Sequence, residues 1–359
     1  MAARLSEDAH ISMLTASPGD ELYSVFGHSA LRVYDPLIGI DEVYNYGTFD
    51  FDTPNFYLKF TRGKLYYQLS VSTFRQFLFE YDQEQRAMYE QNLNLTVNEK
   101  QRIYDFLLVN RRPENRSYLY DFFYDNCATR IRDLIDHLLD IDWGEDPYPG
   151  PPRSFRDMLQ PYLSNMPWAA FGIDLALGLP ADRIATPWHY MFLPDEMFTA
   201  FAQARHRDGR PLVGHHQVVL EASVRTTSSS PITPKAVTWT IFFIGLASLF
   251  HKRFSYVFDK AFFSALGLTG IVIAVLWFFS DHESTNQNMN LLWAIPTHLY
   301  FIFRTGTSGK HTTARYYFLG VFILSTLLIV LWNFIPQGFN AAFFPLVLLA
   351  GGKALRVTR

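Results

Sequence analysis

The chain has 359 residues, a net charge of -3 at pH 7 and 49% hydrophobic residues. Lys and Arg number 31 against 34 Asp and Glu, and neither a basic stripe nor a nucleic-acid motif is present, which argues against nucleic acid as a partner. The composition differs between two parts of the chain, because Asp259, Asp281 and Glu283 are the only acidic residues in its last third. We expect a polar domain over 1–230 and a membrane domain over 231–359.

Alternation of apolar and polar residues predicts short strands in the polar domain, and capping signals predict helices between them. The predicted strands cover 10–15, 28–35, 42–49, 64–71 and 213–225. The predicted helices cover 55–60, 72–88 and 96–109, and the stretch 154–207 is mainly helical. Residues 226–234 are rich in Ser, Thr and Pro and predict a linker into the membrane.

Cys127, the single cysteine, stands where a helix is predicted to begin. Residues 118–124 before it are aromatic and strand-like. The apolar residues after it have the spacing of an amphipathic helix, at Ile131, Leu134, Ile135, Leu138 and Leu139. At a helix N-terminus, unpaired N–H groups and the helix dipole stabilise a thiolate and offer donors to an oxyanion. Cys127 is therefore a candidate nucleophile, with a buried, inert cysteine as the alternative.

His28 opens the predicted strand 28–35 and is the candidate base, because a strand end is a place from which it can face the helix of Cys127. A structural histidine is the alternative. The histidines His189, His206, His215 and His216 show no metal-ligand spacing with Cys, Asp or Glu. We therefore expect no metal and no diffusible cofactor.

Apolar runs beyond the linker predict about five membrane segments, at 236–250, 261–280, 291–303, 316–335 and 339–350, or four if the last is re-entrant. Lys and Arg gather after the first and third runs and in the C-terminal tail, whereas 281–290 and 332–340 contain none. By the positive-inside rule the polar domain lies outside the cytoplasm and the C-terminus inside. Export requires a signal, so we expect a removed signal peptide upstream of the present N-terminus.

Gly27-His28-Ser29 on an early strand and Asn126-Cys127 at a later helix start resemble the permuted papain-like hydrolases and acyltransferases. That group includes NlpC/P60-like enzymes and lecithin:retinol acyltransferase relatives, in which the histidine precedes the cysteine. More closely, the chain resembles the lipoprotein N-acyltransferases of the Lnb type. The matching stretches are 26–35, 46–51, 55–64, 124–133 and 288–298. The resemblance implies an α+β, permuted papain-like domain in the periplasm and a helical transmembrane domain in the bacterial inner membrane.

The resemblance also implies a reaction, which moves a fatty acyl chain from a membrane glycerophospholipid to the α-amino group of a diacylglyceryl-cysteine lipoprotein. Cys127 would carry the chain as a thioester and His28 would move the proton. By analogy with catalytic triads, Asn45 is the first choice for orienting the histidine and Asp50 the second. Asn126 either supports the oxyanion or serves only as the helix N-cap.

Polar side chains that could meet a phospholipid head group occur in two places. Arg62 and Lys64 lie in a predicted turn, and His282, Asn286 and Asn288 lie in a polar loop expected at the bilayer surface. Ordinary solvated loops are the alternative in both places.

Two other functions fit parts of this pattern. A membrane-tethered cysteine amidase or peptidase acting on peptidoglycan would use the same residues, although one anchor would suffice for it. A structural or transport protein with an incidental cysteine is the alternative outside enzymes.

Overall fold

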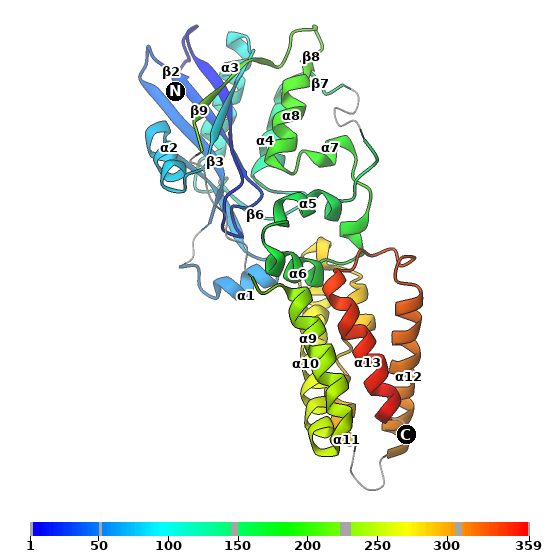
Figure 1. The fold of residues 1–359 in the computed structure, drawn as a ribbon. Helices are drawn as coiled ribbons and strands as arrows, with labels where there is room; N and C mark the ends of the chain where they lie inside the picture. The colour runs from blue at the N-terminus through cyan, green and yellow to red at the C-terminus, as the bar shows by residue number, and fades with distance from the viewer. Residues whose placement is uncertain (1–2, 50–51, 145–149, 223–230, 306–310, 358–359) are drawn as a thin grey trace. The chain divides into compact units, whose positions relative to one another are not determined.

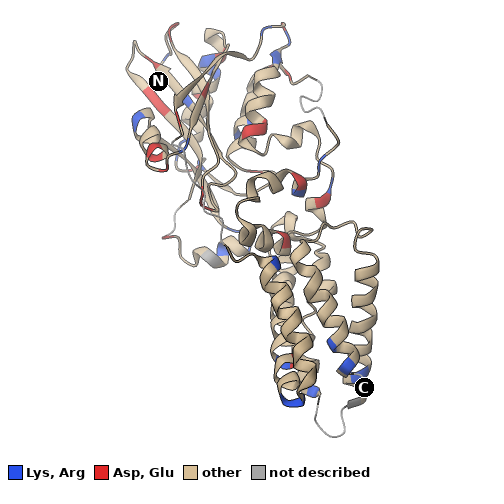
Figure 2. Cartoon of the chain, viewed as in Figure 1, with Lys and Arg blue, Asp and Glu red and all other residues tan. Residues whose placement is uncertain are grey.

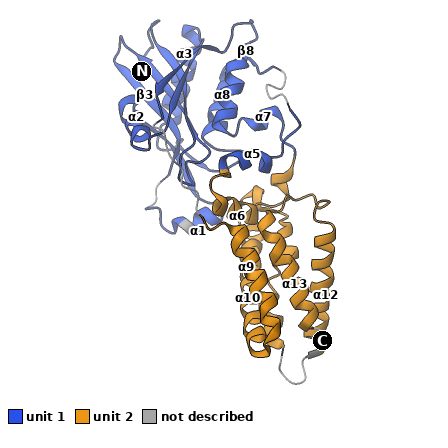
Figure 3. Cartoon of the chain, in the orientation of Figure 1, with its two compact units in different colours: residues 1–162, 184–226 blue, residues 163–183, 227–359 orange. Residues whose placement is uncertain are grey.

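The computed structural model describes all residues except 1–2, 50–51, 145–149, 223–230, 306–310 and 358–359 (Figure 1). The chain forms two compact units, coloured separately in Figure 3. The first contains residues 1–162 and 184–226, and the second contains 163–183 and 227–359. The stretch 163–183, which we expected in the polar domain, thus packs with the helices that follow the linker. Most of the predicted linker lies outside the described residues.

A seven-stranded antiparallel sheet with the order β6-β4-β3-β2-β1-β5-β9 forms the centre of the first unit. The strands are β1 His10–Ala16, β2 His28–Asp35, β3 Ile40–Thr48, β4 Tyr66–Thr73, β5 Met88–Leu93, β6 Ser117–Leu119 and β9 Val213–Leu220. Two short strands, β7 Ile141–Asp142 and β8 Arg205–His206, pair with each other. The predicted return of the chain to the sheet at β9 is confirmed.

Helices cover both faces of this sheet, as Figure 1 shows. The helices of the first unit are α1 Phe56–Thr61, α2 Phe74–Gln83, α3 Val97–Asn110, α4 Cys127–Leu138, α5 Phe155–Leu163, α7 Pro187–Tyr190 and α8 Pro194–Gln203. The larger core lies between one face and α3, α4 and α8, and the smaller core packs Phe77 and Tyr81 of α2 on the other face. Because the sheet is antiparallel and separate helices pack on it, the unit is an α+β domain, as predicted.

One predicted helix is too long. The stretch 72–88 is helical only to Gln83, because the chain turns into the left-handed conformation at Gln85, where φ is 54°. Met88 instead begins β5, which the sequence pattern did not indicate. The helix start was read correctly, since Thr73 and Gln76 form a reciprocal capping box.

The second unit is helical and has its own core. Its helices are α6 Pro167–Ala176, α9 Pro234–Ala247, α10 Lys252–Phe278, α11 His298–Arg304, α12 His311–Val330 and α13 Phe344–Val357. Lys252–Phe278 and Thr312–Val330 are long and apolar enough to cross a membrane, and Pro234–Phe250 forms a shorter apolar helix.

The third predicted membrane run is broken rather than continuous. A short 3-10 turn, Met289–Leu292, is separated from α11 by Pro296, which has no N–H to continue a helix. The carbonyl of Trp293 is contacted by the buried His298 imidazole at 3.2 Å, which satisfies a polar group freed by the break.

Candidate active site

Cys127 is the first residue of α4 and is half-buried. Asn126 fixes this start, because its side-chain oxygen accepts hydrogen bonds from the N–H groups of Ala128 and Thr129, at 2.8 and 3.0 Å. Thr129 completes the box by accepting from the N–H of Asn126 at 2.8 Å. The N–H of Cys127 itself has no acceptor within the helix, as for any first residue. The predicted helix start is confirmed.

Asn126 is not available to an oxyanion, which corrects that part of our expectation. Its side-chain nitrogen donates to the carbonyls of Phe122 and Phe192, at 2.8 and 2.9 Å, while its oxygen takes the two helix N–H groups. An amide offers two donors and one oxygen with two lone pairs, so all four positions are occupied. Asn126 is the N-cap of α4, and it also connects the segments that contain Phe122 and Phe192 to the start of this helix.

His28 stands at the start of β2, on which α4 packs, and it lies close enough to Cys127 for each group to shift the pKa of the other. Burial alone lowers the pKa of His28, but the Cys127 charge and the hydrogen bonds to Cys127 and Asn45 raise it above its usual value. Burial raises the pKa of the Cys127 thiol, yet the His28 charge and hydrogen bond, together with N–H groups of Ser29 and Ala128, bring it below its usual value. The opposite shifts favour an imidazolium–thiolate pair.

Asn45 on β3 holds the other side of the histidine ring. Its side-chain oxygen lies 2.8 Å from Nε2 of His28 and accepts from the N–H of Gly47 at 2.8 Å. Because the Gly47 N–H can only donate, the atom facing it must be the amide oxygen, and Nε2 of His28 must carry a proton. Nδ1 is then the ring nitrogen left to exchange a proton with Cys127.

The irregularity in β3 explains how Asn45 reaches the ring. The pairing of β3 with β4 shifts register between Asn45 and Thr48, as at a β-bulge, which re-aims side chains locally. Gly47 lies within this irregular stretch, and a Cβ there would stand 2.3 Å from Cε1 of His28. Only glycine leaves room for the imidazole.

Four tyrosines surround the pair, and the sequence did not single them out beyond its high aromatic content. They are Tyr67, Tyr81, Tyr118 and Tyr120. Burial is the main cause that raises the pKa of each, and the Cys127 charge acts in the same direction; together they raise the pKa of Tyr67 to about 12. Tyr81 stacks on His28 with centroids 6.4 Å apart, and Tyr67 stacks on Tyr120 at 4.2 Å. The reacting groups therefore lie in a largely apolar, aromatic environment.

The other predicted site residues have different outcomes. Asp50 lies outside the described residues, and Arg62 and Lys64 are exposed beside α1. His282 and Asn286 belong to the second unit, so their predicted substrate contacts stay predictions.

The structure corrects the predicted substrate contact of Asn288. Its side chain is 1% exposed and makes four hydrogen bonds inside the second unit, so it is not free to meet a substrate. Its nitrogen donates to the carbonyls of Leu175 and Ala176, and its oxygen accepts from Asn290 N–H and Gln337.

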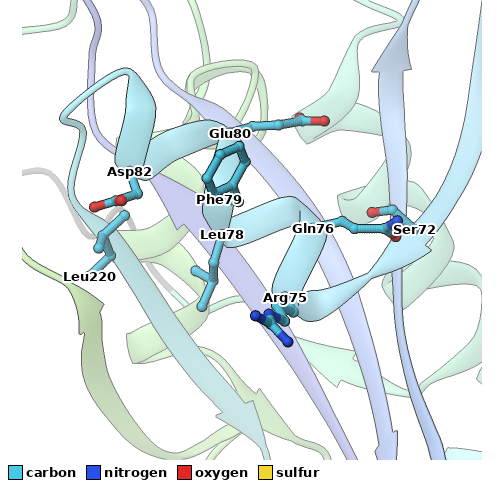
Figure 4. Close-up of a pocket in the computed structure, with 8 residues that line it drawn as sticks. All are labelled: Ser72, Arg75, Gln76, Leu78, Phe79, Glu80, Asp82 and Leu220. Atoms are coloured by element: carbon cyan, nitrogen blue, oxygen red, sulfur yellow. The ribbon is translucent and has the colours of Figure 1, made fainter.

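The described residues contain no group of His, Cys, Asp and Glu that could hold a metal ion. A hollow of about 740 Å³ lies on α2 (Figure 4), and none of the predicted site residues lines it. Its lining residues are Ser72, Arg75, Gln76, Leu78, Phe79, Glu80, Asp82 and Leu220. The hollow is therefore separate from the Cys127 pair.

Two family models match the chain. The model of the Lnb N-terminal periplasmic domain matches residues 5–152, and the model of the Lnb transmembrane domain matches residues 226–355. Together they indicate a membrane-embedded protein with a periplasmic N-terminal domain. Searches of curated proteins and of solved structures found no match.

Proposed function

The chain belongs to the Lnb family, and from this premise we propose that it is a lipoprotein N-acyltransferase that works through a thioester on Cys127. The single observation that carries the proposal is the pairing of Cys127, at the N-terminus of α4, with His28, since each group shifts the pKa of the other, in opposite directions. A nucleophile in a periplasmic domain that is attached to a membrane domain suits an acyl donor that is itself a membrane lipid.

In the first half-reaction, the Cys127 thiolate attacks the carbonyl carbon of a glycerophospholipid ester. The N–H of Cys127 donates to the developing oxyanion, aided by the positive end of the helix dipole. The ester C–O bond then breaks, and the leaving glycerol oxygen takes the proton from Nδ1 of His28. The products are a lysophospholipid and an acyl thioester on Cys127.

In the second half-reaction, the α-amino group of a diacylglyceryl-cysteine lipoprotein attacks the thioester. Neutral His28 takes a proton from the attacking nitrogen, the C–S bond breaks, and Cys127 leaves as thiolate. The amide is formed and the imidazolium–thiolate pair is restored, so the cycle needs no cofactor. Asn45 keeps Nε2 protonated throughout, which leaves Nδ1 as the site of transfer.

Exclusion of water decides whether the thioester is passed to an amine or hydrolysed. The buried tyrosines around the pair favour transfer, because their rings fill the space beside the sulfur with apolar surface. The order of a strand histidine before a helix cysteine is also what supports our assignment of a permuted papain-like arrangement.

The charge distribution supports a cytoplasmic C-terminus. In the second unit, most Lys and Arg gather at the bundle end where α10 begins and α13 ends (Figure 2), among them Lys252, Arg253, Lys260, Arg304 and Arg356. By the positive-inside rule this end faces the cytoplasm.

The test is intact-protein mass spectrometry of the purified chain after incubation with phospholipid vesicles. We expect a fatty-acyl mass increment that hydroxylamine removes and that is absent from Cys127→Ala and strongly reduced in His28→Ala. Addition of a diacylated lipopeptide should discharge the increment and yield the triacylated peptide. A folded chain that gains no increment would favour a hydrolase acting on peptidoglycan or a role without catalysis. Release of free fatty acid alone would show hydrolysis of the lipid in place of acyl transfer and would contradict the proposal.

A further inference from the structure

We propose that α6 is an interfacial helix whose outward face lies against the phospholipids of the periplasmic leaflet. The surface is defined by Pro167–Ala176, and its partner is the lipid surface itself. This inference concerns the second unit alone and does not depend on the chemistry at Cys127.

The composition of α6 does not suit a helix face in water. Asp174 is its only charged side chain, and the Trp168 indole is its only other side chain that can hydrogen-bond. Asp174 is 4% exposed and accepts from Asn340 at 2.9 Å. The outward face therefore consists of apolar residues, with Trp168 at 45% exposed and Gly172 exposed beside it. A helix that is apolar all round needs a non-aqueous environment on every side.

The inward side of α6 is fixed to the loops at one end of the helical bundle. Asn288 and Asn290 donate to the carbonyls of Asp174, Leu175 and Ala176, which are the last residues of the helix and have no partners within it. Their side chains are buried, at 1% and 0% exposed. The amides thus act as a C-terminal cap supplied by another part of the chain, and they hold α6 in one orientation.

The chain just after α6 approaches the same loop closely. The N–H of Gly178 donates to the carbonyl of Ser284 at 2.9 Å, and a Cβ at Gly178 would stand 1.8 Å from the carbonyl oxygen of Asn286. On the far side, Asp182 accepts from the N–H of Gly338 at 2.8 Å. These bonds bind the whole stretch 163–183 to the membrane domain.

The contacts of α6 also show at which end of the helical bundle it lies. The Trp168 indole N–H donates to the carbonyl of Ile232 at 2.8 Å, just before α9 begins, and Phe171 packs on Phe343 with centroids 5.0 Å apart. Figure 1 shows α6 at the ends of α9 and α10, with which it is in contact. Because α9 follows directly on the periplasmic domain, this is the periplasmic end.

Length excludes a spanning role for α6. Ten residues of helix extend about 15 Å, whereas the hydrocarbon core of a bilayer is about 30 Å thick. A short apolar helix at a bundle end, with an exposed tryptophan whose N–H is hydrogen-bonded, is what the membrane–water interface accommodates.

The test places a nitroxide on α6 in the full chain. The background is Cys127→Ser, which removes the only native thiol, and the reporter is Gly172→Cys, where an added Cβ meets no atom within 4 Å. Gly320→Cys on α12, equally open, is the matched lipid control, and Phe79→Cys, 62% exposed on α2, is the matched aqueous control. Ala169→Cys is a second reporter in case the first variant does not fold.

Each labelled protein is reconstituted in phosphatidylethanolamine and phosphatidylglycerol vesicles, and its collision rates with oxygen and with a water-soluble nickel chelate are compared. We expect the oxygen-to-nickel ratio at α6 to be several-fold above that at position 79 and to approach that at position 320. A ratio equal to that at position 79 would show that the face is in water. Low rates with both reagents would show that a protein partner covers it, and either result would overturn the proposal.

Discussion

Replacing Asn45 by alanine tests the geometry of the site most directly. The change removes the oxygen that lies 2.8 Å from Nε2 of His28 and that fixes the protonated nitrogen through the Gly47 N–H. A hydrogen bond to a charged group contributes about 1.5 to 3 kcal/mol, and this one favours the imidazolium form of His28. Its loss should reduce the population of the imidazolium–thiolate pair by about 10- to 100-fold, at 1.4 kcal/mol for each factor of ten.

The sign of the pH effect follows from the pKa shifts. The pKa of Cys127 is lowered because the charged His28 stabilises the thiolate. When the imidazolium is less stable, the pH at which Cys127 ionises should therefore rise. The expected rise is about one to two pH units, since 1.36 kcal/mol corresponds to one unit.

The assay is the rate of Cys127 alkylation by iodoacetamide as a function of pH, followed by intact-protein mass spectrometry. Asn45→Asp keeps an acceptor for both N–H groups and should retain the low inflection. Asn92→Ala is the matched control, because among the described residues its amide hydrogen-bonds to the exposed His10 ring alone, at 3.3 Å. If folded Asn45→Ala keeps the native rate and inflection, Asn45 does not position His28 and our account of the tautomer is wrong.

Three further outcomes are expected. Asn126→Ala should lower the free energy of unfolding by about 3 kcal/mol, measured by denaturant titration, because an N-cap is lost and two carbonyls, one buried and one partly buried, lose their donor. Arg86→Met should move the loss of acylation at high pH to still higher pH, because the buried Arg86 charge lowers the pKa of His28. Arg86→Lys keeps the charge and should leave the pH profile of acylation unchanged. An identical pH profile in both variants would contradict this. Gly178→Ala should lower the thermal unfolding temperature, since its Cβ would meet a backbone oxygen at 1.8 Å, while Gly172→Ala, with open space around it, should leave the temperature unchanged or raise it.

Much of the fold could be predicted because its signals are local. Alternation identified β1, β2, β3 and β9, a capping residue identified the start of α2, and a capping box identified the start of α3. The helix at Cys127 was visible in the spacing of the apolar residues that follow it. Where a prediction failed, as for the end of α2, a single left-handed residue with no sequence signature changed the course of the chain.

The candidate site could be predicted only in part from the sequence. Residue type and order were enough to choose Cys127 and His28, but the choice of Asn45 rested on its neighbouring strand alone. Whether an asparagine orients a histidine depends on strand register and on the bulge near Gly47, neither of which is encoded in nearby residues. The tyrosines around the pair come from α2, β4 and the stretch around β6, which only packing brings together.

By itself, the sequence determined the two-part organisation, the candidate nucleophile and the helix N-terminus at which it stands, because composition, spacing and capping act over a few residues. The tertiary structure decided what each amide does. Asn126 was expected to support the oxyanion or to cap the helix, and Asn288 was expected to contact substrate. Each has its hydrogen-bonding capacity filled, in part by carbonyls distant in the chain. The same long-range bonds assign 163–183 to the membrane domain, since buried carbonyls at a helix end must find donors wherever the fold supplies them.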